Sequence, residues 1–197
     1  MLLEHHHIPT APFVCVPKYG VEVDYTSLAQ HLSFPLFAKP VAASTSNGIL
    51  PSNKILQHED LQNTIEGLRA QFPDQEVMLE EFLPRAEFTV SILGPNTSPR
   101  VLGALEVTWY NPKGLECNGD NSSIDFATCF SKIGRGPGQD IGTIAADLED
   151  PVVKSVADVA VSTYRVLGCR DGARVDVRLG SKEQGSIPNV IEVYLVP

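Results

Sequence analysis

Hydrophobic positions along the chain repeat with two periods, and segments of the two kinds alternate. Short apolar runs and apolar–polar alternation, bounded by Gly, Pro, Asn or Asp, are typical of β-strands. The segments with this pattern are Pro12–Val16, Phe34–Pro40, Glu76–Phe82, Glu87–Leu93, Val101–Trp109, Asp171–Leu179 and Asn189–Val196. Those at 87–93 and 101–109 predict an antiparallel pair, and the last two predict a hairpin.

Helical spacing of apolar residues appears in two other stretches. Leu61, Ile65 and Leu68 predict a helix over His58–Phe72. A second helix is predicted to begin at Asp150-Pro151, with proline in its first turn, and to end at Gly168. Its expected buried stripe is Val153, Val156, Ala160, Tyr164 and Leu167.

Two shorter signals complete the secondary-structure prediction. Asp24–His31 is predicted to be a short helix that Asp24 or Thr26 could cap. Asn111–Asp140 is polar and rich in glycine, and it is predicted to contain a long loop.

The order of these elements predicts an α+β protein with two lobes. The boundary is expected near Leu83-Pro84, which gives an N-terminal lobe over 1–83 and a C-terminal lobe over 84–197. A ligand commonly binds where two such lobes meet.

Composition narrows the functional classes. The chain has 197 residues, 43% of them hydrophobic, which suits a globular protein with a sizeable core. Its net charge of -9 argues against sequence-independent binding of nucleic acid, which needs a basic surface. We find no apolar run of membrane-spanning length and no signal peptide, so a cytoplasmic location without membrane association is expected.

Cysteine and histidine patterns predict no metal centre of their own. The cysteines have no C-x-x-C spacing and are expected to be free thiols in a reducing compartment; they are Cys15, Cys117, Cys129 and Cys169. The cluster His5-His6-His7 lies at a terminus that is expected to fray, and we assign it no function.

The C-terminal hairpin carries the strongest chemical signal. Arg174, Asp176 and Arg178 share one face of their strand because side chains alternate with period two. The partner strand carries a single acid, Glu192, so the hairpin is predicted to bring an arginine and two carboxylates together. This is the chemistry of a magnesium–triphosphate site. An ordinary salt-bridged sheet face is an equally weighted alternative.

A lysine and a hydroxyl-rich loop form a second signal. Lys39 ends an apolar strand, so its ammonium group is expected at the sheet edge, where it can pair with phosphate. The loop Ala43–Gly48 follows, and its hydroxyl and N–H groups could bind phosphate or carboxylate oxygens. Taken alone, the loop is more often a plain surface loop.

Acidic residues end one apolar strand and begin the next. At least one of Glu80 and Glu81 is expected to point inward or into a cleft, and Glu87 poses the same question. A desolvated carboxylate needs a partner. An adenine amino group, a ribose hydroxyl or a lysine would each serve.

Several of these segments together resemble the ATP-grasp ligases, and among them the D-alanine–D-alanine ligase family. The resemblance covers nearly the whole chain and keeps the family's motif order. The matching motifs are 8–14, 35–40, 77–83, 86–90, 167–171 and 173–176.

The resemblance implies two α+β lobes that sandwich ATP, with Mg²⁺ or Mn²⁺ as the cation. It implies metal ligation by Asp176 and Glu192, and catalytic roles for Arg174 and Ser46. The nucleotide-binding positions that it implies are Lys39, Ser44, Thr45, Glu80, Glu81, Leu83 and Glu87. Glu80 would face the adenine, Glu81 and Leu83 would pair with it through backbone groups, and Glu87 would bind the ribose.

The reaction that the resemblance implies joins a carboxylate to an amine through an acylphosphate. D-alanine or a related amino acid would be phosphorylated by ATP, and the amine of a second molecule would then attack. The identity of that second substrate and the oligomeric state do not follow from the sequence.

The sequence departs from the family pattern in its final strand. Tyr194 stands where the family has asparagine, and Leu195-Val196-Pro197 replaces a polar, glycine-containing continuation. The chain also starts at the family's central lobe, and the family's lysine-bearing loop has no clear counterpart within 111–132. An inactive nucleotide-binding remnant or a gene-model fragment is therefore the alternative to an active ligase.

Overall fold

The computed structural model describes residues 2–43, 46–110, 126, 140–180 and 186–196. The chain forms two compact units. Met1–Ala11, Leu83–Ser123 and Ile141–Pro197 make up the first, and Pro12–Phe82 and Ile124–Asp140 make up the second. The division into lobes over 1–83 and 84–197 stays a prediction.

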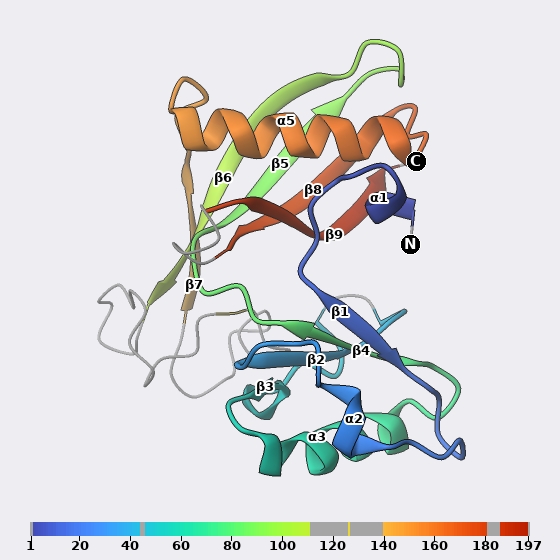
Figure 1. The fold of residues 1–197 in the computed structure, drawn as a ribbon. Coiled ribbons are helices and arrows are strands. Elements are labelled where there is room, and N and C mark those ends of the chain that lie inside the picture. The colour runs from blue at the N-terminus through green and yellow to red at the C-terminus, as the bar shows by residue number, and fades with distance from the viewer. Residues whose placement is uncertain (1, 44–45, 111–125, 127–139, 181–185, 197) are drawn as a thin grey trace. The chain divides into compact units, whose positions relative to one another are not determined.

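The second unit is built on a four-stranded sheet in the order β1-β4-β2-β3 (Figure 1). Its strands are β1 (Phe13–Val16), β2 (Leu36–Pro40), β3 (Lys54–Ile55) and β4 (Val77–Glu81). Strand β4 pairs antiparallel with β1 and β2, and β2 pairs antiparallel with β3. The helix α3 (Leu61–Gln71) packs against β2 and β4.

Alternation along β2 explains which face of this sheet is buried. Leu36 and Ala38 are fully buried, whereas the alternate residues Phe37 and Lys39 are only partly buried. Leu61, Ile65 and Leu68 of α3 pack with the buried face. The predicted helix stripe is therefore confirmed, and Lys39 lies on the opposite face of the sheet.

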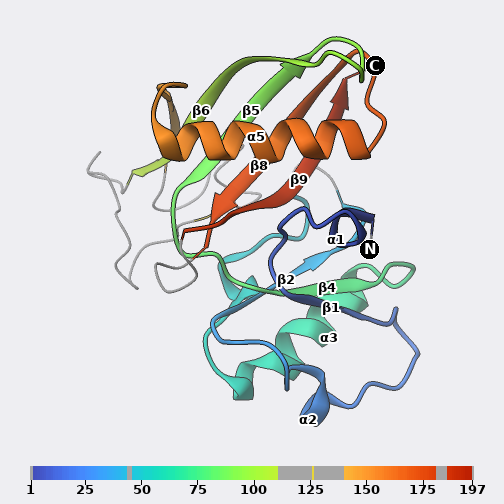
Figure 2. The ribbon, with the colours of Figure 1, turned by 45° about the horizontal axis from the view of Figure 1, so that its top comes forward.

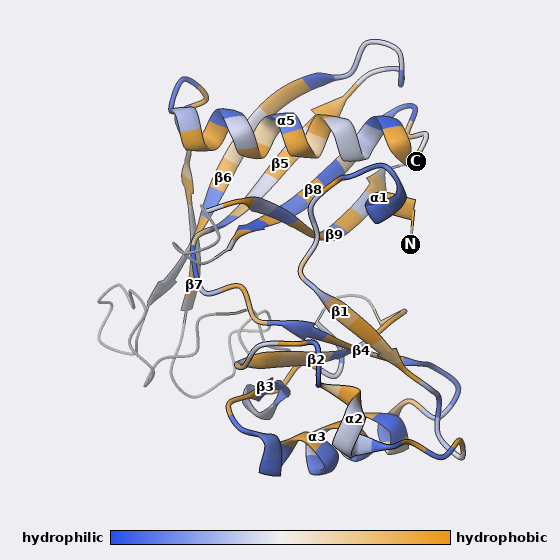
Figure 3. Ribbon diagram, in the orientation of Figure 1, coloured by the Kyte–Doolittle hydropathy of each residue, from blue (hydrophilic) through white to orange (hydrophobic). Residues whose placement is uncertain are grey.

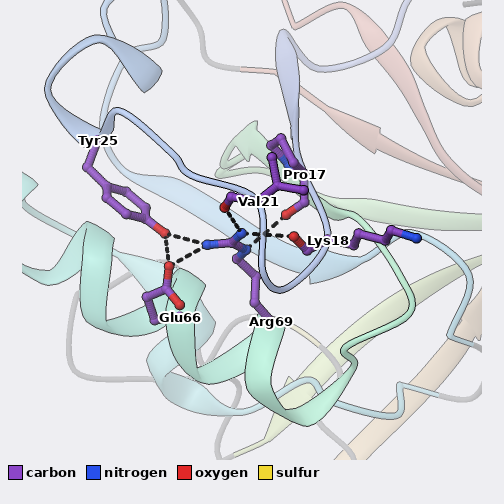
Figure 4. A network of polar contacts seen from close by, with 6 residues as sticks. All are labelled: Pro17, Lys18, Val21, Tyr25, Glu66 and Arg69. Atoms are coloured by element: carbon purple, nitrogen blue, oxygen red, sulfur yellow. Dashed lines mark hydrogen bonds and ion pairs between the residues drawn. The ribbon is translucent and has the colours of Figure 1, made fainter.

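A buried arginine ties the loop after β1 to α3 (Figure 4). The Arg69 guanidinium donates to the carbonyls of Pro17, Lys18 and Val21. It also binds Glu66 and the hydroxyl of Tyr25. Tyr25 belongs to the short helix α2 (Tyr25–Leu28), which is shorter than predicted and is capped by Asp24.

The first unit is built on a five-stranded sheet in the order β7-β6-β5-β8-β9. Its strands are β5 (Glu87–Leu93), β6 (Arg100–Tyr110), β7 (Asp140–Ala145), β8 (Gly172–Leu179) and β9 (Pro188–Val196). The helix α5 (Pro151–Val166) lies across one face of this sheet (Figures 1 and 2). The pairs β5–β6 and β8–β9 are antiparallel, as the sequence predicted.

Both ends of α5 follow the predicted signals. The Asp150 carboxylate accepts hydrogen bonds from the N–H groups of Val152 and Val153, and Pro151 occupies the first turn. At the other end Gly168 has φ +69°, a left-handed conformation that favours glycine. The Cys169 N–H reaches back to the Tyr164 carbonyl.

The buried stripe of α5 is as predicted except at its last position. Val153, Val156, Ala160 and Tyr164 are buried against the sheet, and apolar and polar positions alternate along the helix (Figure 3). The prediction for Leu167 is wrong, because this residue is 38% exposed. It follows the last helical residue as the C-cap, where the chain has already left the helix.

Some elements had no signal in the sequence. The two-residue strand β3 is too short to show a period, β7 follows the unassigned stretch, and a one-turn helix α1 (Leu2–His5) forms where fraying was expected. Cys15 and Cys169 are free thiols, as predicted, and Cys117 and Cys129 lie outside the described residues. Within the described ranges, we find no helix long and apolar enough to cross a lipid bilayer.

Candidate functional site

Polar side chains of β5, β8 and β9 gather on the face of the five-stranded sheet opposite α5. Period two places Glu87 and Thr89 of β5 on this face, together with the predicted arginine and aspartate of β8. In the observed register Thr89 lies opposite Asp176, which in turn lies opposite Glu192 of β9. Arg174 lies opposite Tyr194. The predicted convergence of Arg174, Asp176 and Glu192 is therefore confirmed.

Arg174 and Asp176 form a two-pronged ion pair. Arg174 Nε lies 3.0 Å from Asp176 Oδ1, and Nη2 lies 2.9 Å from Oδ2. The Thr89 hydroxyl donates to Asp176 Oδ1 at 3.0 Å. Asp176 is buried, whereas 40% of the Arg174 side chain is exposed. The arginine therefore holds the acid in place while it keeps a surface for a further anion.

Tyr194 completes the cluster. Its ring lies under the Arg174 guanidinium, with the guanidinium carbon 3.9 Å from the ring centroid, which is a cation–π contact. Burial, followed by hydrogen bonding to Glu192, raises the pKa of Tyr194 to about 12. The phenol is therefore protonated at neutral pH and can donate to the Glu192 carboxylate.

Burial and a neighbouring carboxylate both oppose ionisation of Asp176. Burial raises the pKa of Asp176, and the negative charge of Glu192 raises it further, against the lowering by Arg174 and Thr89. The Arg174 pKa is raised by Asp176 although burial acts to lower it. A buried acid with a raised pKa beside a second acid is the arrangement that a bound cation would relieve.

A divalent cation fits this donor set. Asp176 and Glu192 offer hard carboxylate oxygens from directly opposed positions. Among the described residues we find no group of three or more His, Cys, Asp or Glu side chains that could hold a metal. A cation held by these two carboxylates could complete its shell with further oxygen donors such as water or phosphate, as Mg²⁺ commonly does.

A second ion pair lies further along the same face. Arg178 Nη1 is 3.3 Å from Glu87 Oε2, and Arg178 Nε donates to the Arg85 carbonyl at 3.2 Å. Both side chains are largely buried. Glu87 is thus held by a structural partner on the same sheet face as Thr89, which answers the question that the sequence left open about its direction.

The second unit carries its own polar pair on the open face of the small sheet. Lys39 Nζ lies 2.6 Å from Glu80 Oε1, and 23% of the Lys39 side chain is exposed. The sequence predicted both residues for the site, and the lysine partner that was one of three alternatives for Glu80 is observed. Phosphate binding by Lys39 would require it to share or exchange this partner.

Aromatic rings lie beside this pair. Phe37, Phe82 and Phe126 contact one another with centroid distances of 4.9 to 6.1 Å. Lys54 Nζ lies 4.0 Å from the Phe82 ring centroid. Phe37 lies two residues before Lys39 on β2 and opposite Glu80 on β4, so this face of the sheet combines ring surfaces with charged groups.

Glu81, one of the two predicted hinge residues, already forms hydrogen bonds within the protein. The Glu81 N–H donates to the Pro12 carbonyl at 2.9 Å, and the Glu81 carboxylate accepts from the Ser33 N–H at 2.8 Å. The Leu83 side chain is buried. Glu81 is therefore fixed by local structure, and only its carbonyl oxygen would be offered to a base.

The structure describes the last residues, 46–48, of the hydroxyl-rich loop. Ser44 and Thr45 lie outside the described residues, whereas Ser46 has φ +56° and its carbonyl accepts the Ile49 N–H. Gly48 has φ +79°, and a Cβ there would lie 2.5 Å from the Phe72 ring, so glycine is required.

A buried asparagine fixes this end of the loop to the sheet. The Asn53 amide donates to the carbonyls of Ala38 and Gly48 at 2.7 and 2.9 Å. These bonds fix Gly48, two residues after Ser46, beside β2.

The structure thus assembles the predicted residues into two groups, one in each unit. Arg174, Asp176 and Glu192 form the first with Glu87 nearby, and Lys39 and Glu80 form the second. The sequence analysis assigned no role to Thr89 or Arg178. Period-two alternation through Glu87, Thr89 and Ser91 was the signal that would have placed Thr89 on the polar face.

The relationship to known proteins agrees with this arrangement. Residues 2–197 match the family described as D-ala D-ala ligase C-terminus. The chain belongs to this family. The recognition of an ATP-grasp, D-alanine–D-alanine ligase-like chain is therefore confirmed at the level of the family.

Individual relatives show how much of such a protein the chain spans. It is 27% identical over 197 residues to D-alanine–D-alanine ligase B of Clostridium perfringens, covering all of this chain and 55% of that protein. It is 29% identical over 184 residues to the D-alanine–D-alanine ligase of Bordetella petrii, covering 89% of this chain and 50% of that protein. The chain spans about half the length of the curated relatives that it matches.

Solved structures show the same fold. The D-alanine–D-alanine ligase of Bacillus anthracis matches with a TM-score of 0.70 at 18% identity, over all of this chain and 54% of that one. The VanG D-Ala:D-Ser ligase of Enterococcus faecalis matches with a TM-score of 0.69 at 24% identity, over all of this chain and 50% of that one. The α+β, ATP-grasp prediction is thereby confirmed.

Proposed function

We propose that this chain binds ATP with Mg²⁺ and contributes the ATP-binding half of a carboxylate–amine ligase. The observation that carries the proposal is the cluster of Arg174, Asp176 and Glu192 on one sheet face. A bidentate arginine, a buried acid with a raised pKa and a second acid directly opposite are what a metal–polyphosphate complex needs. A solved relative, the Bacillus anthracis ligase, was crystallised with ATP, which supports the choice of nucleotide.

Each residue has a role that its surroundings allow. Asp176 and Glu192 would hold Mg²⁺ or Mn²⁺, and that cation would neutralise charge on the phosphates. Arg174 would stabilise the transferred phosphoryl group through the part of its guanidinium that Asp176 leaves exposed. Phosphoryl transfer depends mainly on such positioning and charge compensation.

The other nucleotide contacts are proposed residue by residue from the family resemblance. Lys39 and the loop residues Ser44, Thr45 and Ser46 would bind phosphates, with Ser46 also near the reacting groups. The remaining contacts are assigned to Glu80, the backbone of Glu81 and Leu83, and Glu87.

The reaction would proceed in two displacements. A carboxylate oxygen of D-alanine or a related amino acid attacks the γ-phosphorus, and the bond to ADP breaks. The amine of a second molecule then attacks the acylphosphate carbon, loses a proton, and displaces inorganic phosphate. Arg174 suits both steps because each develops negative charge on oxygen.

The partners follow from this chemistry. They are small amino-acid substrates, as in the ligases to which the chain is related. The reaction is expected to take place in the cytoplasm, where ATP is available. The oligomeric state and the second substrate are not part of the proposal.

A second candidate function is nucleotide binding without ligation. It is favoured by Tyr194, which engages both Arg174 and Glu192. A phenol is also a poorer ligand for a hard cation than a carboxylate or an amide oxygen.

Product analysis separates the two candidates. The protein is incubated with ATP, Mg²⁺ and D-alanine, and both ADP and the dipeptide are measured. A ligase gives ADP and dipeptide in equal amounts, each dependent on D-alanine. ATP binding by calorimetry without either product would support the second candidate, and the absence of ATP binding would overturn both.

A further inference from the structure

Thr89 joins the proposed site from a strand that is far away in the sequence. In the register of the five-stranded sheet it lies directly opposite Asp176, and its hydroxyl donates to Asp176 Oδ1 at 3.0 Å. The Asp176 side chain is 9% exposed, so this donor serves a largely desolvated carboxylate. A hydrogen bond to such an acid is charge-assisted and is stronger than one between neutral groups. What Thr89 contributes therefore depends on what Asp176 does.

The donors to Asp176 are distributed unequally between its two oxygens. Oδ1 accepts from the Thr89 hydroxyl and from Arg174 Nε, whereas Oδ2 accepts from Arg174 Nη2 at 2.9 Å. A carboxylate oxygen has two lone-pair positions, so both positions of Oδ1 are taken. Within the described part of the chain, Oδ2 retains one lone pair for a further partner.

The sheet order places Thr89 and the second acid of the site on opposite sides of Asp176. Strand β8 lies between β5 and β9, and Glu192 of β9 is the other residue directly opposite Asp176. A donor on β5 that holds Oδ1 therefore leaves Oδ2 for a cation shared with β9.

Building on the proposed function, we propose that Thr89 is a positioning residue. Its hydroxyl occupies Oδ1 of Asp176 and thereby reserves Oδ2 for the divalent cation that Asp176 would share with Glu192.

Thr89 and Arg174 hold Asp176 in different ways. Threonine is branched at Cβ and stiff at χ1, so its hydroxyl is fixed relative to β5. Arg174 has a long side chain that is 40% exposed, and under the proposed function its guanidinium also binds the transferred phosphoryl group. Thr89 is then the donor that keeps the Asp176 carboxylate oriented while Arg174 engages an anion. Hydrogen-bond partners of metal-ligating groups commonly affect metal affinity by about 10- to 100-fold.

Two substitutions isolate the hydroxyl. Thr89→Val keeps the branched shape that suits a strand and removes the donor, whereas Thr89→Ser keeps the donor and removes the methyl group. Thr163→Val and Thr163→Ser are the matched controls, because buried Thr163 belongs to the same unit but its hydroxyl donates to the Val159 carbonyl within α5. Circular dichroism and thermal unfolding establish that each variant is folded.

Two binding measurements on the full chain test the role of the hydroxyl. Mn²⁺ binding in the presence of ATP is followed by electron paramagnetic resonance, and binding of inorganic tripolyphosphate without metal is followed by calorimetry. For Thr89→Val we expect Mn²⁺ affinity to fall by about 10-fold, and Thr89→Ser should keep most of the affinity. Neither variant should change tripolyphosphate affinity, because Thr89 donates to the acid. The Thr163 variants should leave both affinities unchanged.

The outcomes distinguish this inference from the proposed function. If the unmodified protein binds Mn²⁺–ATP and Thr89→Val binds Mn²⁺ equally well or more tightly, the inference is wrong and the proposed function stands. An equal loss of Mn²⁺ affinity in Thr89→Val and Thr89→Ser also overturns it, because packing rather than the donor would then matter. If the unmodified protein binds neither probe, the proposed function fails and the inference fails with it.

The metal-free measurement guards against a different route. A loss of tripolyphosphate affinity in Thr89→Val as large as its loss of Mn²⁺ affinity would mean that Thr89 acts on Arg174 or on the phosphates, which contradicts its assignment to Asp176. Should Thr89→Val not fold, the comparison of Thr89→Ala with Thr89→Ser decides in its place, since these two variants differ by the hydroxyl alone.

Discussion

Two arginines, one in each unit, lie in opposite surroundings. Arg69 is 3% exposed, and its guanidinium donates to three backbone carbonyls, a tyrosine hydroxyl and the Glu66 carboxylate (Figure 4). Arg174 is paired with a single acid, Asp176, and 40% of its side chain is exposed. All three guanidinium nitrogens of Arg69 are engaged, whereas Arg174 Nη1 has no partner among the described residues.

The difference separates a structural arginine from one available to a ligand. Partners that satisfy a buried guanidinium completely leave nothing for a ligand and stabilise the fold. Burial of Asp176 costs stability, and Arg174 offsets part of that cost while its exposed donors can bind an anion. Each prediction below tests one side of this contrast.

The largest effect is expected for Arg174→Ala. It removes the group that would stabilise the transferred phosphoryl, so formation of ADP with ATP, Mg²⁺ and D-alanine should fall by about 100- to 1,000-fold. The melting temperature at neutral pH should fall as well, because buried Asp176 loses its paired cation, so turnover is compared at a temperature at which the variant is folded. A large drop in melting temperature with unchanged turnover would reverse the assignment of Arg174 and Arg69.

The opposite pattern is expected for Arg69→Ala. Its removal leaves the carbonyls of Pro17, Lys18 and Val21 without their donor, so the free energy of unfolding should fall by about 2–4 kcal/mol. Chemical denaturation measures the change, and Arg165→Ala, at an exposed position of α5, is the control. A loss no larger than that of the control would show that the network contributes little.

Asp176→Asn should separate binding from stability. It removes a proposed metal ligand, so Mn²⁺ affinity in the presence of ATP should fall by at least about 10- to 100-fold. The folded-state pKa of Asp176 is raised by burial, so its ionised form is destabilising above the ordinary pKa of aspartate.

The stability of the Asp176→Asn variant therefore depends on pH. Without metal it should melt at a higher temperature than the unmodified protein at neutral pH. The difference should shrink as pH falls through the raised pKa toward the ordinary aspartate range, where both proteins are neutral at this position. A lower melting temperature at neutral pH would mean that the Arg174 ion pair outweighs the cost of burial.

The smallest effect is expected for Tyr25→Phe. The hydroxyl lies between Glu66 and Arg69, and its loss removes one hydrogen bond at each while the ring remains. The free energy of unfolding should fall by about 1 kcal/mol, measured by denaturation. An effect as large as that of Arg69→Ala would mean that the tyrosine, rather than the arginine, organises the network.

Most of the fold could be predicted because its signals are local. The α5 helix has its apolar stripe, its Asp150 cap and Gly168 within one stretch of sequence, and the C-terminal hairpin shows its alternation directly. Strand β3 could not be predicted, since two residues cannot display a period. Leu167 was misplaced because helical spacing alone does not mark the residue at which the chain turns away.

The site was predictable where the partners lie on strands that follow one another directly in the sequence. Arg174, Asp176 and Glu192 were brought together by pairing β8 with β9, which the sequence predicted as a hairpin. The contact of Thr89 with Asp176 depends on β5 lying beside β8, although more than eighty residues separate them, and no local pattern encodes that neighbour. The Arg69 network was missed for the same reason, because its acceptors lie in a loop about fifty residues earlier.

The most direct test of the polar sheet face as a metal–nucleotide site is calorimetric titration with ATP, with and without Mg²⁺, of the unmodified protein and of Glu192→Gln. The substitution keeps the size of the side chain and one acceptor oxygen, and it removes the charge. We predict Mg²⁺-dependent ATP binding that weakens by at least about 10-fold in the variant, with the melting temperature unchanged. Equal affinity of the two proteins for ATP in Mg²⁺ would contradict the assignment.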